Sequence, residues 1–149
     1  MNERRTTTSA EETIAFARTF GQRLRRGDVV TLFGNLGSGK TQFVKGVCQA
    51  FNTRTPATSP SFVILNRYNG TDGGSGELLL YHVDLYRVKS LAEIYDLGYE
   101  EFLRGDGICL IEWAETLGEL LPEQRYDVRF CFGAEENERH IEIAGVHTS

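Results

Sequence analysis

Residues 34–41, Gly-Asn-Leu-Gly-Ser-Gly-Lys-Thr, constrain the fold of this chain more than any other stretch. The five residues before them, 29–33, are nearly all apolar and rich in β-formers, which predicts a strand covered on both faces. Residues 42–51 carry apolar side chains at helical spacing. The order strand, glycine loop, helix is typical of a phosphate-binding loop, in which glycines allow backbone N–H groups to turn toward phosphate oxygens.

This loop predicts a site for a nucleoside triphosphate with Mg²⁺, and ATP is the nucleotide we expect. The candidate binding residues are Gly37, Ser38, Gly39, Lys40, Thr41 and Gln42. Lys40 would reach the β and γ phosphates as a point charge, and the hydroxyl of Thr41 would bind Mg²⁺. Gln42 would add a backbone donor at the start of a helix whose dipole favours anions.

Two acids are candidates for the carboxylate that completes such a site. Glu112 ends the apolar run 108–111, and Asp84 ends the run 80–83 in the same way. A carboxylate at the end of a neighbouring strand can hold the magnesium shell or orient the attacking water. The sequence leaves open which acid has which role, and an acid that merely ends a strand is the structural alternative.

Three other features near these motifs allow more than one interpretation. Ser61 closes the segment Thr-Ser-Pro-Ser at 58–61, which either senses a γ-phosphate or forms a solvated turn. Trp113 directly follows Glu112 and either stacks on a ligand or packs at a strand end. His82, on an alternating strand pattern, is interpreted as a structural histidine.

Periodicity elsewhere predicts an α/β fold with a mixed sheet. Ser9 and Glu12 have capping-box spacing and begin a helix over residues 10–25, and Ser90 and Glu93 begin a short helix ending near residue 97. Further strands are expected at residues 62–68, 78–84, 107–113, 126–132 and 140–144. The last two form a hairpin, and the glycine-rich stretch 69–76 is expected to be a flexible hairpin tip.

Size and composition favour a single domain over residues 1–149, because 40% of the side chains are hydrophobic. The formal charge is −5, so no global attraction to nucleic acid or an anionic membrane is expected. The three cysteines, Cys48, Cys109 and Cys131, match neither a disulfide framework nor a zinc site. With no apolar run near the roughly 20 residues of a membrane span, we expect a cytoplasmic protein.

Together these motifs resemble the TsaE (YjeE) family, ATPases of bacterial tRNA threonylcarbamoyladenosine biosynthesis. The resemblance rests on the loop 34–41, on Ser59-Pro60-Ser61, on the run from His82 to Arg87 and on Glu112-Trp113. It implies a P-loop NTPase-like three-layer fold with a mixed, centrally parallel sheet. It also implies slow ATP hydrolysis with Mg²⁺ and partnership with the TsaB and TsaD subunits, which modify the adenosine beside the tRNA anticodon. The tRNA would be reached only indirectly, through that complex.

Carried over by position, the resemblance implies catalytic roles for Lys40, Asp84 and Glu112. Thr41 and Glu112 match the metal residues, and Trp113 matches the adjoining aromatic. Two further features resemble parts that border the nucleotide base. They are the segment around Glu11 and Thr13 and the turn before Arg139.

The chain departs from the family pattern at two positions. Asn35 stands where relatives usually carry Asp, which removes a charge near the phosphates. Ser61 stands in place of Thr, which keeps the hydroxyl of the expected nucleotide-binding position but loses the methyl group that restricts its rotamer.

Two alternatives to a partner-coupled ATPase remain at this level. A small-molecule kinase shares the strand, loop and helix, but it needs an arginine-bearing lid, and residues 69–76 contain no Arg or Lys. A nucleotide-gated scaffold would bind ATP without hydrolysing it. The pair of acids beside a complete phosphate loop argues against such a scaffold.

Overall fold

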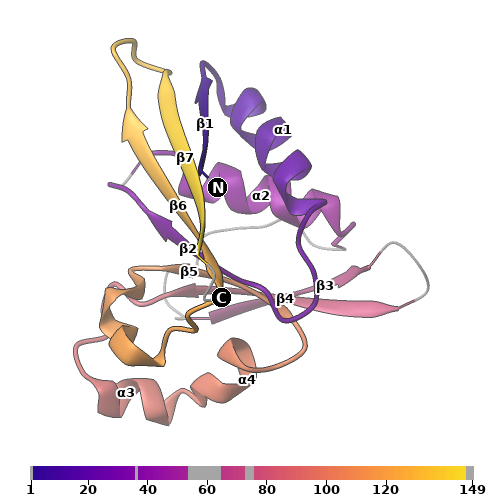
Figure 1. Cartoon of the computed structure of the whole chain (residues 1–149), viewed down its shortest axis with the longest axis vertical. Coiled ribbons are helices and arrows are strands. Elements are labelled where there is room, and N and C mark those ends of the chain that lie inside the picture. The colour runs from indigo at the N-terminus through magenta and orange to yellow at the C-terminus, as the bar shows by residue number, and fades with distance from the viewer. Residues whose placement is uncertain (1, 36, 54–64, 73–75, 147–149) are drawn as a thin grey trace.

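The computed structural model describes residues 2–35, 37–53, 65–72 and 76–146. Its seven strands form one sheet in the order β1-β7-β6-β2-β5-β4-β3 (Figure 1). The strands are β1 (Asn2–Thr7), β2 (Val29–Phe33), β3 (Leu65–Thr71), β4 (Glu77–Asp84), β5 (Ile108–Glu112), β6 (Arg125–Phe132) and β7 (Arg139–Val146). The four central strands, β6, β2, β5 and β4, pair in parallel. Antiparallel pairs add β3 at one edge and β7 and β1 at the other.

Helices cover the central strands on both faces, which gives three layers. Those of the described chain are α1 (Ala10–Gly21), α2 (Lys40–Ala50), α3 (Leu91–Asp96), α4 (Tyr99–Leu103) and the 3₁₀ helix η1 (Ala114–Leu120). α1 and α2 pack on one face, and α3, α4 and η1 pack on the other (Figure 1). This arrangement confirms the predicted three-layer fold with a mixed, centrally parallel sheet.

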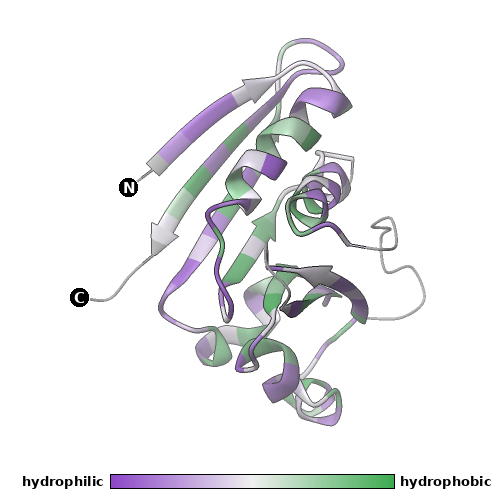
Figure 2. Ribbon diagram, turned by 90° about the vertical axis from the view of Figure 1, so that its right-hand side faces the viewer, coloured by the Kyte–Doolittle hydropathy of each residue, from purple (hydrophilic) through white to green (hydrophobic). Residues whose placement is uncertain are grey.

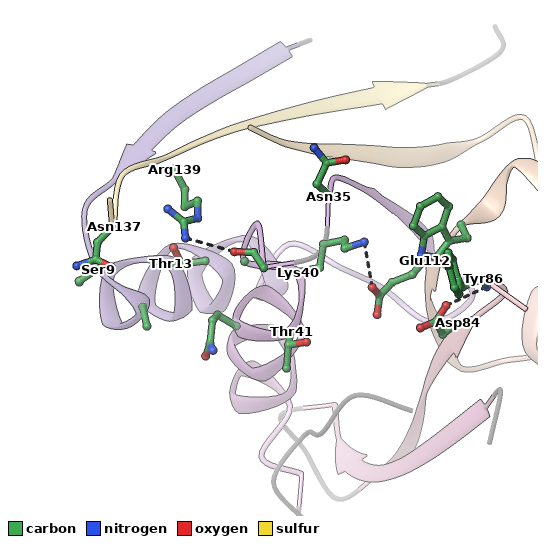
Figure 3. Close-up of a pocket in the computed structure, with 15 residues that line it drawn as sticks. Ser9, Thr13, Asn35, Lys40, Thr41, Asp84, Tyr86, Glu112, Asn137 and Arg139 are labelled. Carbon is green, nitrogen blue, oxygen red and sulfur yellow. Dashed lines mark hydrogen bonds and ion pairs between the residues drawn. The ribbon is translucent and has the colours of Figure 1, made fainter. Parts of the chain in front are cut away.

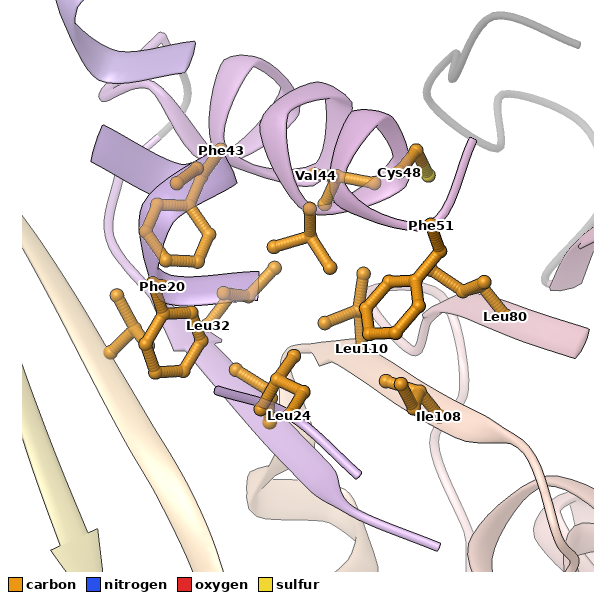
Figure 4. Packing of buried hydrophobic residues seen from close by; sticks show 14 of the residues in the cluster. Phe20, Leu24, Leu32, Phe43, Val44, Cys48, Phe51, Leu80, Ile108 and Leu110 are labelled. Atoms are coloured by element: carbon orange, nitrogen blue, oxygen red, sulfur yellow. The ribbon is translucent and has the colours of Figure 1, made fainter. Parts of the chain in front are cut away.

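Strand β5 shows why the sequences of the central strands are continuously apolar. Ile108 and Leu110 pack against α2, as Figure 4 shows, whereas Cys109 and Ile111 face the layer of α3, α4 and η1. All four side chains are fully buried. Successive side chains of a strand point to opposite faces, so a strand between two helical layers needs apolar residues at every position.

Several predicted elements are confirmed with small shifts of their ends. The strand over 29–33, the helix after the glycine loop, the helix begun by Ser90 and the C-terminal hairpin are all present. The helix predicted over 10–25 instead ends at Gly21. Leu24 follows that end in a turn but is still buried in the core, which explains why its spacing suggested a longer helix.

The prediction of a flexible tip over residues 69–76 is wrong at its start. Asn69, Gly70 and Thr71 belong to β3 and pair with β4. A Cβ atom at Gly70 would lie 2.7 Å from the Phe51 carbonyl oxygen, so this glycine permits a close approach of two backbones. Residues 62–64 of the expected strand and residues 73–75 lie outside the described residues.

Strand β1 was not anticipated, because its sequence is polar throughout, as its hydrophilic colour in Figure 2 shows. It is held by backbone pairing with β7 and contributes no apolar side chain to the core. Among the described residues, no helix has both the length and the apolar character needed to cross a bilayer.

Helices α1 and α2 approach each other closely at two glycines. A Cβ atom at Gly46 would collide with the Ile14 carbonyl oxygen and lie 2.6 Å from the Ala17 Cβ. A Cβ atom at Gly21 would lie 2.8 Å from the Ala50 Cβ. Because α2 starts at the glycine loop, this contact fixes the position of the loop relative to α1.

We predict that Gly46→Ala destabilises the protein by about 1–3 kcal/mol, the usual cost of overpacking a tight contact. The direction of this change is informative, because at a solvent-exposed helix position Gly→Ala stabilises by about 1 kcal/mol. Urea unfolding of Gly46→Ala and of the exposed Gln49→Ala on the same helix measures the difference. A stabilised Gly46→Ala protein would contradict the close approach.

Candidate functional site

The glycine loop joins the carboxyl end of β2 to the first turn of α2. Gly37 and Gly39 have φ angles of +81° and +110°, which L side chains rarely adopt. Gly39 is also the N-cap of α2, and its carbonyl oxygen accepts from the Phe43 N–H. The backbone N–H groups at the N-terminus of an eleven-residue helix are thus placed beside the loop.

The two candidate acids meet at the same edge of the sheet. In the parallel register, Asp84 of β4 is the partner of Glu112 of β5, and Glu112 is the partner of Leu32 of β2. These positions are the carboxyl ends of the strands, where open α/β sheets place their ligand sites. Parallel pairing therefore brings residues far apart in sequence next to the loop.

Glu112 is the most connected side chain of this edge. Its Oε2 atom lies 2.7 Å from Nε2 of His82, and its Oε1 atom lies 3.4 Å from Nζ of Lys40. Both the Glu112 and Lys40 side chains are more than nine-tenths buried. Burial by itself raises the pKa of Glu112, but the bond to His82, the charge of His82 and the charge of Lys40 outweigh it and lower that pKa. Glu112 is therefore held as a carboxylate.

Asp84 has the opposite electrostatic character. Burial is the main cause of its raised pKa, and the neighbouring charge of Glu112 adds to it. The backbone N–H of Tyr86 donates to Oδ1 of Asp84 at 3.0 Å, which opposes part of the rise. Two carboxyl groups with pKa values shifted in opposite directions are suited to different roles.

Trp113 leaves β5 in a left-handed conformation, with φ +60° and ψ +45°. Large side chains seldom adopt this conformation, which costs of order 1–3 kcal/mol and persists where surrounding packing enforces it. The indole ring lies 5.1 Å from Nζ of Lys40 and 5.0 Å from the ring of Tyr86. The turn thus places an aromatic face over the loop lysine.

These groups line one cavity of about 750 Å³. The lining residues are Ser9, Ala10, Thr13, Asn35, Gly37, Gly39, Lys40, Thr41, Gln42, Asp84, Tyr86, Glu112, Trp113, Asn137 and Arg139. In Figure 3, Lys40 lies between two ends of this space, with Glu112, Asp84 and Tyr86 at one end and Ser9, Thr13, Asn137 and Arg139 at the other.

The second end is closed by the β6–β7 turn. Nη2 of Arg139 donates to the Gly37 carbonyl oxygen at 3.3 Å, which ties this turn to the loop (Figure 3). Across the cavity, the Thr13 hydroxyl lies 2.7 Å from the Thr7 hydroxyl, which joins α1 to β1. The cavity therefore has one charged end and one end lined by small polar groups and an arginine.

Comparison with known proteins identifies the family. Residues 7–141 match the family model described as "Threonylcarbamoyl adenosine biosynthesis protein TsaE". The chain belongs to the TsaE family. This confirms the resemblance seen in the sequence motifs.

Curated TsaE relatives are similar over most of their length. The TsaE protein of Bacillus subtilis is 39% identical over 140 residues, which cover 94% of this chain and 84% of the relative. That of Treponema pallidum is 38% identical over 136 residues, covering 91% and 96%. Each is described as "tRNA threonylcarbamoyladenosine biosynthesis protein TsaE". The crystal structure of Bacillus subtilis YdiB superposes with a TM-score of 0.77 at 33% identity, covering 99% of this chain and 87% of that one.

Most residues predicted for the TsaE site lie together in the cavity. Thr13, Gly37, Gly39, Lys40, Thr41, Gln42, Asp84, Glu112 and Trp113 all line it. Ser38 does not, because its side chain is buried beneath the loop, where a Cβ atom at Gly34 would lie 2.6 Å from its Oγ. Ser61 lies outside the described residues, so its role stays a prediction.

Glu11 does not line the cavity, so its place beside the nucleotide base stays a prediction without support from this geometry. It lies with Arg18 and Gln22 along a separate hollow on the exposed side of α1. Helical geometry gives the reason, because Ala10 and Thr13 share the face of α1 that lines the cavity, and a residue one step from Ala10 is turned away from it.

Sequence reasoning gave no site role to three contributors. Ser9 was noted only as a helix cap and Tyr86 only as part of a motif, yet both line the cavity. Asn137, which also lines it, belongs to the turn before Arg139 that the resemblance had indicated. His82, interpreted as structural, bonds to Glu112. Its position two residues before Asp84 was the available signal, because both side chains then point to the same face of β4.

The oxygen atoms at the charged end are donors of a kind that suits Mg²⁺ better than a transition metal. The Thr41 hydroxyl and the Asp84 and Glu112 carboxylates are hard donors, and Mg²⁺ is usually bound by one or two carboxylates together with phosphate oxygens and water. Within the described residues, no group of three or more His, Cys, Asp or Glu side chains forms a metal cage.

The pKa shift of Asp84 predicts a pH-dependent stability. A raised pKa means that the folded protein binds this proton more tightly than the unfolded chain, so Asp84 destabilises the fold once it is ionised. Asp84→Asn should therefore unfold at higher denaturant concentration than wild type at about pH 7. The advantage should shrink as the pH falls toward the ordinary value of 3.8.

Glu112→Gln is the control, for which we expect a change in stability opposite to that of Asp84→Asn. The lowered pKa of Glu112 gives stability that is present above its ordinary value of 4.5 and lost as the pH falls through the folded-state value. This variant should be less stable than wild type at about pH 7. Equal shifts for the two variants would contradict the electrostatic assignment.

Proposed function

We propose that this protein is a magnesium-dependent ATPase that acts in the threonylcarbamoyladenosine modification of tRNA. The pathway is the one printed in the names of its curated relatives. The observation that carries the ATPase assignment is the phosphate loop facing a buried, ionised Glu112 across Lys40, within a cavity of about 750 Å³. This volume lies within the range of about 300–1,000 Å³ that is typical of small-molecule binding sites.

The arrangement of the cavity suggests how ATP binds. Backbone N–H groups of the loop and the start of α2 would take the phosphates, and Lys40 would compensate their charge. Thr41 and Glu112 would hold Mg²⁺, which supplies charge neutralisation on the phosphate oxygens when bound. The end lined by Ser9, Thr13 and Asn137 would take the nucleoside.

Asp84 is the candidate for orienting the attacking water. It borders the same cavity, is half-buried, and has a raised pKa that brings it closer to the range of a general base. Glu112, by contrast, is already engaged by Lys40 and His82. This division supports Asp84, rather than Glu112, as the water-positioning group.

Slow hydrolysis by the protein alone is proposed from the surroundings of the arginines that the structure describes. Arg139, which lines the cavity, is engaged with backbone carbonyl groups, and Arg67 pairs with Glu101. Arg87 is exposed, and Arg54 lies outside the described residues. An arginine that stabilises the transition state accelerates related reactions by about 10³–10⁵. A partner subunit, TsaB or TsaD, is proposed to complete the site.

Contact with tRNA is proposed to be indirect, through those partners, because the chain has a formal charge of −5. The cytoplasmic location and the single-domain organisation expected from the sequence stay predictions. A small-molecule kinase is the second candidate, but no described residue of the β3–β4 turn supplies the basic lid such enzymes use.

Lys40→Ala should weaken Mg²⁺–ATP binding about 10- to 100-fold, because a hydrogen bond to a charged group contributes about 1.5–3 kcal/mol. Calorimetric titration with a non-hydrolysable ATP analogue measures this loss. Lys45→Ala, which removes the same charge from the same helix but not from the cavity, is the matched control. Equal affinities for the two variants would refute the assignment of the loop.

Hydrolysis is predicted to depend on partners and on Asp84. Wild type should release labelled phosphate faster with TsaB and TsaD present than alone. Asp84→Asn should still bind ATP, but its hydrolysis rate should fall about 10²–10⁴-fold, the usual contribution of a general base. Label on a nucleoside or metabolite would instead select a kinase. Normal tRNA modification by Asp84→Asn and Glu112→Gln would select a scaffold.

A further inference from the structure

His82 is a buried polar residue, among those that the structure describes, to which the proposed function gives no role. Its side chain is fully buried in β4, between Leu80 and Asp84 on the face toward α2. If this position served packing alone, an apolar residue would be more favourable, because burying an imidazole costs free energy unless it is hydrogen-bonded. The position therefore calls for an explanation beyond core filling.

The imidazole is satisfied on one side only. Nε2 lies 2.7 Å from Oε2 of Glu112, and Nδ1 has no partner among the residues that the structure describes. In β-sheet terms His82 faces Leu110 across the β4–β5 pair, so it reaches Glu112 diagonally, two residues further along β5. The ring is thus placed to serve Glu112 specifically.

The two oxygens of Glu112 consequently have different partners. Oε2 is paired with the fully buried His82, while Oε1 points to Lys40 at the cavity. A glutamate held by one oxygen cannot rotate its carboxylate to pair both oxygens with Lys40. Oε1 stays available to exchange the lysine for another cation.

We propose that His82 is a positioning residue, which fixes the Glu112 carboxylate so that Oε1 can pass from Lys40 to Mg²⁺ when nucleotide binds. The inference rests on the proposed function, in which Glu112 belongs to the metal shell. Residues that orient metal-binding carboxylates typically change metal affinity or activity by about 10- to 100-fold when replaced. The lowered pKa of Glu112, to which His82 contributes, agrees with this role.

Two amide substitutions separate positioning from packing. In His82→Gln the side-chain amide can reach the place of Nε2 and donate to Glu112, whereas in His82→Asn the shorter amide reaches only the place of Nδ1. Both variants bury one amide at the same site. They differ in their reach to Oε2.

The measurement is a Mg²⁺ titration of protein mixed with a non-hydrolysable ATP analogue. Trp113 is the only tryptophan, and its ring lies 5.1 Å from Nζ of Lys40, so its fluorescence is a binding readout independent of turnover. His82→Asn should raise the half-saturating Mg²⁺ concentration about 10- to 100-fold. His82→Gln should stay close to wild type, and metal-free binding of the analogue should be similar in all three proteins.

A double-mutant cycle with Glu112→Gln tests whether His82→Asn changes the Mg²⁺ requirement through the Glu112 carboxylate. In that background, His82→Asn should leave the Mg²⁺ requirement unchanged. Equal shifts for His82→Gln and His82→Asn, or the full shift of His82→Asn in the Glu112→Gln background, would overturn the inference. Wild type without any Mg²⁺-dependent binding would overturn the proposed function as well.

Nitrogen NMR of the wild-type imidazole decides the question if an amide variant fails to fold. The Nε2 resonance should shift on Glu112→Gln and should keep its hydrogen-bonded position when Mg²⁺ and the analogue saturate wild type. Loss of the hydrogen-bonded signal on saturation would show that Glu112 releases His82, and the positioning role would be wrong.

Discussion

The parallel register of β2, β5 and β4 is the constraint on which the site depends. It places the start of the glycine loop, Glu112 and Asp84 at one edge of the sheet, although they are separated widely along the chain. Parallel strands require crossover connections, and here these are the helical layers that bury the sheet on both faces. The packing that buries the central strands therefore also brings the residues of the site together.

At that edge, the linked side chains of His82, Glu112 and Lys40 place charged groups in a buried environment. A buried ion pair contributes little net stability, because removing two charges from water costs about as much as their attraction returns. Leucine and methionine would fill the same space without this cost. Under the proposed function the pair would exchange with a ligand, because polyphosphate would offer Lys40 a stronger partner and a divalent cation would offer Glu112 one.

The left-handed turn at Trp113 and the raised pKa of Asp84 belong to the same pattern. Each places an unfavourable feature next to the loop rather than elsewhere in the fold. Strained backbone and perturbed carboxyl groups tend to gather at functional sites, where the surrounding structure holds them. Their proximity to the glycine loop supports one site rather than several unrelated irregularities.

The loop, the central strands and the pair of acids could all be predicted from patterns along the sequence. Local rules are sufficient there, because the loop requires glycines at positive φ and a strand between two layers requires an unbroken apolar run. Local rules failed for β1, which is polar and depends on pairing with β7, and for the end of α1, where Leu24 continues the apolar pattern without continuing the helix.

Contacts between distant polar side chains depend on the three-dimensional fold. It turned Glu11 away from the cavity, buried Ser38 under the loop and brought His82 to Glu112 across two strands. Strand register and helix rotation set these contacts, and both depend on packing between distant segments. A pattern along one segment contains no information about them.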